Sequence, residues 1–158
     1  MPHPERRLDA LGLTLPQVVP PVATYVPAVR SGAHVHVSGQ VPLREGRLIA
    51  AGRLGDTVSV ELGYACARQC ALNSLAALKA EAGDLTAVAR VVKALVFVAS
   101  TADFTRHPEV GDGASDLLCE IFGDAGRHAR SAVGVMSLPL NAPVELELLV
   151  ELHQPARG

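Results

Sequence analysis

Two charged residues, Arg130 and Glu145, border the last two apolar stretches of the sequence and are the first candidates for chemistry. Arg130 directly precedes the stretch that begins at Ser131, where a guanidinium could hold a carboxylate or a phosphate through two parallel hydrogen bonds. Glu145 lies near the start of the next stretch. From the residue types alone, the simpler interpretation is a surface arginine at a strand end and a carboxylate that faces solvent or forms a salt bridge.

Other reactive residue types fit structural roles better. His34 and His36 alternate on one strand face, but no third metal ligand has an obvious place, so we expect no metal site. Cys66 and Cys70 lie four residues apart on one helix face, where buried thiols are more natural than a disulfide. Ser38 shares a face with His36, but nothing orients that base, so a strand-end hydroxyl that binds backbone or ligand is the better interpretation.

Composition and missing motifs exclude several classes of function. There is no Walker loop, no G-x-S-x-G serine motif and no H-E-x-x-H zinc motif. The net charge is -2 and only five residues are aromatic, which argues against nucleic-acid binding by a basic face or a stacking platform. No apolar run approaches the roughly 20 residues that span a bilayer. The three cysteines do not suggest a disulfide framework, and with no apolar signal core at the N-terminus we expect a cytoplasmic protein.

Hydrophobic periodicity places these residues on a short series of elements. The alternation of Val35 and Val37 with polar residues is typical of a half-buried strand, and a continuous β-branched run indicates a buried central strand. We expect strands at residues 25–29, 34–40, 48–51, 88–99, 131–138 and 144–152, and helices at residues 5–13, 58–82 and 112–122.

The order of these elements predicts one α+β domain, a mixed β-sheet with two α-helices packed on one face. The last strand indicates what the other face carries. Val144, Leu146 and Leu148 point one way, toward the helices, and Glu145 and Glu147 point the other. The second face is therefore expected to meet solvent, a ligand cleft or a partner subunit.

The C-terminal third also carries a recognisable pattern. Ala129-Arg130-Ser131, then Leu138-Pro139 and Val144-Glu145-Leu146-Glu147, resembles the signature of the Rid family of reactive-intermediate deaminases, also called YjgF-type and formerly L-PSP endoribonuclease-like. Residues 25–32, 37–42 and 91–103 resemble the opening strands and the central strand of the family. The resemblance extends over residues 22–152.

The resemblance implies a chorismate-mutase-like fold and homotrimers with three clefts between subunits. It implies hydrolysis of small enamine and imine acids of the 2-aminoacrylate type to 2-keto acids and ammonia, without a cofactor. Arg130 matches the residue that binds the substrate carboxylate, and Glu145 matches the acid that holds and polarises the attacking water. Tyr25 matches an aromatic side chain that lines the cleft, and Ser38 and Gly39 match its polar wall.

The sequence departs from the family pattern inside the expected pocket. Ala132 stands where a cysteine is common, and Asp112 stands where an asparagine is frequent, so that its carboxylate would repel an acidic substrate unless another group compensates. His128 and Gly134 replace a proline and a larger residue. We therefore expect a divergent branch, with a longer N-terminal arm at residues 1–21 followed by a single domain at residues 22–158.

Two alternatives to deamination remain. The expected cleft could bind a small carboxylate without turnover, as a sensor or chaperone-like module with Arg130 as the anchor. The older family name suggests an endoribonuclease that inhibits translation, against which the acidic balance and the absence of an evident acid-base histidine pair argue.

Overall fold

The computed structural model describes residues 3–18, 20 and 23–154, and within them the chain forms a mixed α+β fold. The expected strand at residues 25–29 lies within the described residues. Residues 1, 2, 19 and 21 of the expected arm, and residues 22 and 155–158 of the expected domain, lie outside them. The α-helices are α1 (Pro4–Ala10), α2 (Val60–Ala82) and α3 (His107–Phe122). The strands are β1 (Ala28–Ser31), β2 (His34–Gln40), β3 (Leu43–Arg44), β4 (Arg47–Leu48), β5 (Val88–Ala99), β6 (Ala129–Val135) and β7 (Val144–Leu152).

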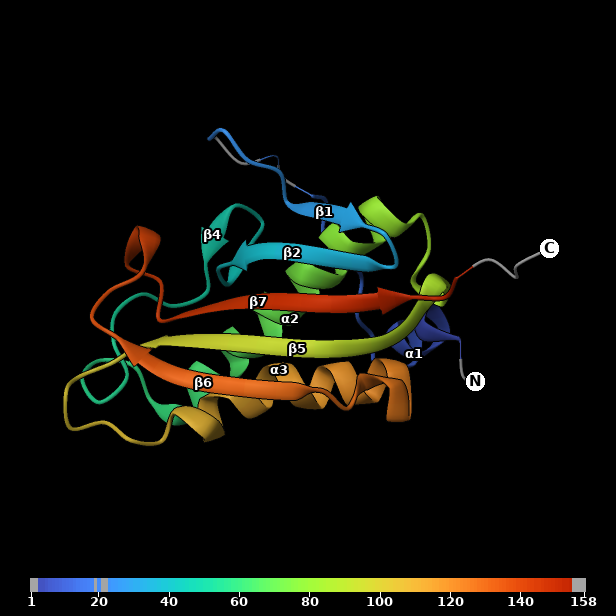
Figure 1. Ribbon diagram of the computed structural model, residues 1–158. Coiled ribbons are helices and arrows are strands. Elements are labelled where there is room, and N and C mark those ends of the chain that lie inside the picture. The colour runs from blue at the N-terminus through green and yellow to red at the C-terminus, as the bar shows by residue number, and fades with distance from the viewer. Residues whose placement is uncertain (1–2, 19, 21–22, 155–158) are drawn as a thin grey trace.

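Five strands form one twisted sheet in the order β1-β2-β7-β5-β6, and β3 and β4 form a separate two-stranded hairpin. All neighbours in the sheet are antiparallel except β5 and β6, which run parallel and are joined through α3. Helices α2 and α3 cover one face, and the described residues leave the opposite face uncovered (Figure 1). This is the two-layer architecture expected from the order of the elements.

Burial explains why α2 and β5 form where the periodicity predicts them. Helix α2 begins where the Ser59 hydroxyl accepts a hydrogen bond from the Leu62 N–H, and it ends at Gly83 with positive φ. Its Cys66 and Cys70 are buried and free, as expected. β5 is an interior strand between β7 and the edge strand β6, and alternate side chains of it are fully buried beneath the helices: Ala94, Val96 and Val98.

Helix α3 begins five residues earlier than the sequence predicts, at His107 rather than at residue 112. Pro108 occupies the first turn, where its fixed φ suits a helix and its missing N–H costs nothing. Gly111 and Gly113 lower the intrinsic helix propensity, but both are buried against neighbouring elements. The early start matters for the site because it adds a turn of backbone beside β6.

Three strands differ from their expected bounds. The first strand runs over Ala28–Ser31 rather than residues 25–29, and β6 runs over Ala129–Val135 rather than residues 131–138. The expected strand at residues 48–51 is the two-residue β4, which pairs with β3 across a turn at Glu45 and Gly46. Strands β2, β5 and β7 match their predicted bounds.

The short helix α1 packs on the domain rather than extending from it. Leu8 is buried, and the Arg7 guanidinium donates a 2.7 Å hydrogen bond to the Glu120 carbonyl of α3. Of the helices in the described part of the chain, none combines the length and apolar character needed to cross a lipid bilayer.

Candidate functional site

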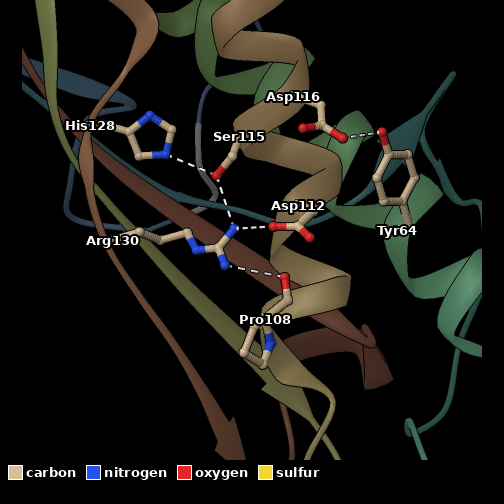
Figure 2. A network of polar contacts seen from close by, with 7 residues as sticks. All are labelled: Tyr64, Pro108, Asp112, Ser115, Asp116, His128 and Arg130. Atoms are coloured by element: carbon tan, nitrogen blue, oxygen red, sulfur yellow. Dashed lines mark hydrogen bonds and ion pairs between the residues drawn. The ribbon is translucent and has the colours of Figure 1, made fainter.

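Arg130 lies on β6, the edge strand of the sheet, and its side chain runs toward α3 (Figure 2). Nη1 donates a 2.8 Å hydrogen bond to Oδ1 of Asp112 and a 3.1 Å bond to Oγ of Ser115. Nη2 donates a 3.2 Å bond to the carbonyl oxygen of Pro108. Three groups from two turns of α3 thus fix the position of one guanidinium, with 21% of the arginine side chain exposed.

These contacts leave part of the guanidinium available. An arginine has five N–H donors, and the three bonds use both hydrogens of Nη1 and one of Nη2. Among the described residues, nothing accepts a hydrogen bond from Nε or from the remaining hydrogen of Nη2. The side chain is therefore held in place while two of its donors stay available for a ligand.

A second layer of hydrogen bonds supports Ser115. Its hydroxyl lies 2.9 Å from Nε2 of His128, and Nδ1 of His128 lies 2.6 Å from the Gly126 carbonyl. Since a carbonyl only accepts, Nδ1 carries the proton, and Nε2 accepts from Ser115. Burial lowers the pKa of His128, and the nearby Arg130 charge lowers it further, which favours this neutral form. Each group in this series therefore donates to the next, from Arg130 through Ser115 and His128 to the Gly126 carbonyl.

Asp112 is the only acidic partner of Arg130 among the described residues, and half of its side chain is exposed (52%). Asp116, one turn further along α3, is engaged elsewhere: it accepts a 2.7 Å hydrogen bond from the Tyr64 hydroxyl of α2 (Figure 2). That bond raises the pKa of Tyr64 to about 12, so the phenol stays protonated and ties the two helices together. The ion pair with Arg130 thus offsets the charge of Asp112, while half of the Asp112 side chain stays exposed.

Glu145 lies on β7 in a half-buried position on the uncovered face. Burial raises the pKa of its carboxyl, and the negative charge of Glu147 raises it further. A β-carbon added at Gly39 would collide with Oε1 of Glu145, so only glycine leaves room for this carboxylate beside β2. A carboxyl with a raised pKa beside open backbone is suited to accept a proton from water near neutral pH.

Arg130 and Glu145 of one chain point to opposite faces of the sheet. Arg130 pairs with Ala94 of β5, which pairs with the buried Leu148 under the helices. Glu145 pairs with Phe97 of β5, whose other partner is Val133. Directly opposed residues in a sheet share a face, and Phe97 is three positions from Ala94, so the two rows face opposite ways. One chain therefore does not bring the two predicted catalytic side chains together.

The remaining predicted residues divide between the same two faces. Ala132 lies two positions after Arg130, with its β-carbon against Gly111 of α3. Ser38 belongs to the irregular end of β2 near Gly39, and its hydroxyl donates a 2.6 Å bond to the Val26 carbonyl. That bond fixes the backbone next to Tyr25, whose side chain is 57% exposed. The site residues thus form two groups: Arg130, Asp112 and Ala132 beside α3, and Glu145, Ser38, Gly39 and Tyr25 away from it.

Gly134, a departure from the family pattern, has a local explanation. The Ser100 hydroxyl and Nε2 of His107 lie 3.1 Å apart, directly over the Gly134 backbone, and a β-carbon at Gly134 would approach both closely. A small residue on β6 is thus matched to a histidine in the first turn of α3. No grouping of three or more histidine, cysteine or acidic side chains suited to a metal ion occurs within residues 3–18 and 23–154.

Sequence reasoning missed Ser115 and the Pro108 carbonyl as partners of Arg130. A signal was present, because Pro108 and Ser115 lie four residues before and three residues after Asp112, and such spacings share one face of a helix. Pro108 was missed because the predicted helix began at Asp112. Ser115 lay within the predicted helix but was not connected with Arg130.

Comparison with known proteins assigns the chain to a family. Residues 5–152 match the family described as "YjgF/chorismate mutase-like, putative endoribonuclease". The chain belongs to this family. The expected resemblance and the expected fold are therefore confirmed, and the match also includes α1, which precedes the region of resemblance found in the sequence.

Three proteins are similar to this chain over most of its length. The protein TCP17 of Trypanosoma cruzi is 47% identical over 147 residues, which is 92% of each chain. A crystal structure of an Agrobacterium tumefaciens protein of unknown function is 44% identical, with a TM-score of 0.89 over 95% of this chain and 92% of that one. A 2-iminobutanoate/2-iminopropanoate deaminase of Dermatophagoides farinae is 29% identical over 143 residues, or 89% of this chain and 95% of the mite protein.

Proposed function

We propose that this protein hydrolyses small 2-imino acids, and their enamine tautomers, to 2-keto acids and ammonia. The observation that carries the proposal is the guanidinium of Arg130, fixed by three bonds yet with two donors left for a ligand. A carboxylate is the group that such paired donors hold best. The name of the mite relative, a 2-iminobutanoate/2-iminopropanoate deaminase, supports a substrate that carries one carboxylate next to an imine.

The chemistry needs one anchor and one base. Arg130 holds the substrate carboxylate, which places the imine carbon at a defined distance from a water on Glu145. Glu145 takes a proton from that water as its oxygen bonds to the imine carbon, and it passes this proton to the nitrogen, which gives a carbinolamine. In the second step Glu145 takes the proton of the carbinolamine hydroxyl as the C=O bond of the keto acid forms and the C–N bond breaks. It gives that proton to the departing nitrogen, so ammonia leaves and the carboxylate is regenerated.

We further propose that two copies of the chain complete each site, within a homotrimer. The anchor and the base of one chain face opposite sides of its sheet, so a shared site needs the anchor of one copy and the base of another. The uncovered face also exposes apolar side chains that a partner would bury, among them Val29 (52%) and Val133 (42%). A cyclic arrangement of three copies then forms three identical clefts, each with residues from two neighbours.

One observation favours carboxylate binding without turnover as a second candidate. The anchor is complete within a single chain, whereas the base lies on the other face. A protein that does not bring the two together would bind keto or imino acids through Arg130 and leave them unchanged.

Ammonia release tests the proposal. An amino-acid oxidase or a threonine dehydratase generates 2-iminobutanoate or 2-aminoacrylate in place, and ammonia is followed with and without this protein. We expect the protein to accelerate release above the spontaneous rate in proportion to its concentration. A rate that stays at the spontaneous value across small and bulky imines would rule out deamination and leave the binding role.

A further inference from the structure

The positive charge of the Arg130 guanidinium is offset by a negative charge of the same chain before any ligand binds. Asp112 lies 2.8 Å from Nη1 of Arg130 and forms an ion pair with it. The other two partners of the guanidinium, Ser115 and the Pro108 carbonyl, are neutral. A ligand therefore meets two directed N–H donors on a pair with no net charge, rather than a free cation.

Other charges on α3 do not restore the positive potential. Arg106 in the turn before the helix donates two hydrogen bonds to Glu109, and Asp116 is bonded to Tyr64. Burial and the nearby Arg130 charge lower the pKa of His128, which favours the neutral form of its ring. Within the described network, a second negative group on a ligand would find no second cation and would be repelled by Asp112.

We propose that Asp112 determines specificity at this site by selecting ligands with a single carboxylate against ligands with two. The inference deepens the proposed deamination and rests on it for the substrate class, 2-imino acids whose side chains carry no acidic group. A single carboxylate is held by the geometry of the two donors, which Asp112 leaves intact. A second carboxylate adds repulsion without adding a contact, so Asp112 acts on selectivity more than on the chemical step.

Replacement of Asp112 by asparagine isolates the charge. The amide oxygen of asparagine still accepts the bond from Nη1, and Ser115 and Pro108 keep their bonds, so the orientation of the guanidinium is preserved. Asp116→Asn is the matched control, because it removes one negative charge from the same helix at a residue bonded to Tyr64 instead of to the anchor.

Binding of keto acids gives a readout that does not depend on turnover. Titration calorimetry would compare 2-oxobutanoate, with one carboxylate, and 2-oxoglutarate, with two, on the assembled wild-type protein and both variants. We expect wild type to bind 2-oxobutanoate about tenfold more tightly, and Asp112→Asn to bring the ratio of the two Kd values close to one, mainly through tighter binding of 2-oxoglutarate. Asp116→Asn should keep the wild-type ratio.

The two proposals fail in different ways. A ratio unchanged by Asp112→Asn, or changed equally by Asp116→Asn, would overturn the role of Asp112, whether or not the protein deaminates. Absence of ammonia release by a wild-type protein that shows the expected ratio would overturn deamination and leave the selectivity of the anchor standing. Binding of neither keto acid by wild type would overturn both.

Discussion

Replacement of Arg130 by alanine is expected to abolish the acceleration of imine hydrolysis. The variant loses two hydrogen bonds between a cation and the substrate carboxylate, each worth about 1.5–3 kcal/mol. Together these correspond to a fall of about 10²- to 10⁴-fold in kcat/KM. It also leaves the Asp112 carboxylate without its partner, facing an acidic substrate. The measurement is ammonia release from an imine generated in place, over a range of substrate concentrations.

Folding should survive this change. The Arg130–Asp112 pair is partly exposed, and such pairs contribute at most about 1 kcal/mol. Arg106→Ala is the matched control, because it also removes an arginine that forms an ion pair with an acidic residue of α3. Arg130→Lys keeps the charge but loses the paired donors, and it should stay impaired. Wild-type rates in a folded Arg130→Ala variant would contradict the proposal that Arg130 binds the substrate carboxylate.

Replacement of Glu145 by glutamine is expected to reduce kcat by about 10²- to 10⁴-fold, the usual contribution of a positioned general base. The amide still hydrogen-bonds to water but cannot take its proton, so KM should change little. In the wild type, kcat/KM should rise with pH through the pKa of Glu145, which burial and Glu147 raise above the ordinary glutamate value. The pH profile from acidic to neutral pH measures both effects.

A neighbouring variant separates a base from a merely structural carboxylate. Glu147→Gln removes the charge that helps to raise the pKa of Glu145, so it should shift the rise in kcat/KM to lower pH and keep the rate at neutral pH. Stability gives a further control. Because the folded state favours protonated Glu145, folding loses stability as pH rises from the unfolded pKa to the raised folded one. Glu145→Gln should therefore be at least as stable as wild type at neutral pH. A pH–rate profile that Glu147→Gln leaves unchanged would contradict the role of Glu145 as the general base.

Local pattern was sufficient to predict most of the fold. Residues 88–99 form a continuous β-branched run and residues 144–152 alternate strictly, and both strands match their predicted bounds because burial on one or two faces dictates such patterns. Helix α3 was predicted five residues too short, since Pro108 and Gly111 have low helix propensity. Packing against β6 and α2 outweighs that low propensity. A short stretch of sequence does not show which distant elements will pack against it.

The candidate site residues were named from the sequence, but their arrangement could not be predicted from it. The types and spacing of Arg130 and Glu145 carried the family pattern, yet which face each side chain occupies depends on the register of β6, β5 and β7. Register is a property of paired strands that are distant in sequence. The partner of Asp112 was also hidden: the sequence suggested a repelling carboxylate, whereas its neighbour in space is the guanidinium itself.

The central claim is that the anchor of one chain works with the base of another, and mixed oligomers test it most directly. Arg130→Ala and Glu145→Gln chains, each inactive alone, would be co-expressed with different affinity tags, and oligomers that carry both tags would be purified through both. In a ring of three, one of the three clefts then combines an intact Arg130 with an intact Glu145 from its neighbour. We expect such trimers to recover about one third of wild-type activity. Doubly tagged oligomers that remain as inactive as the parent variants would contradict it.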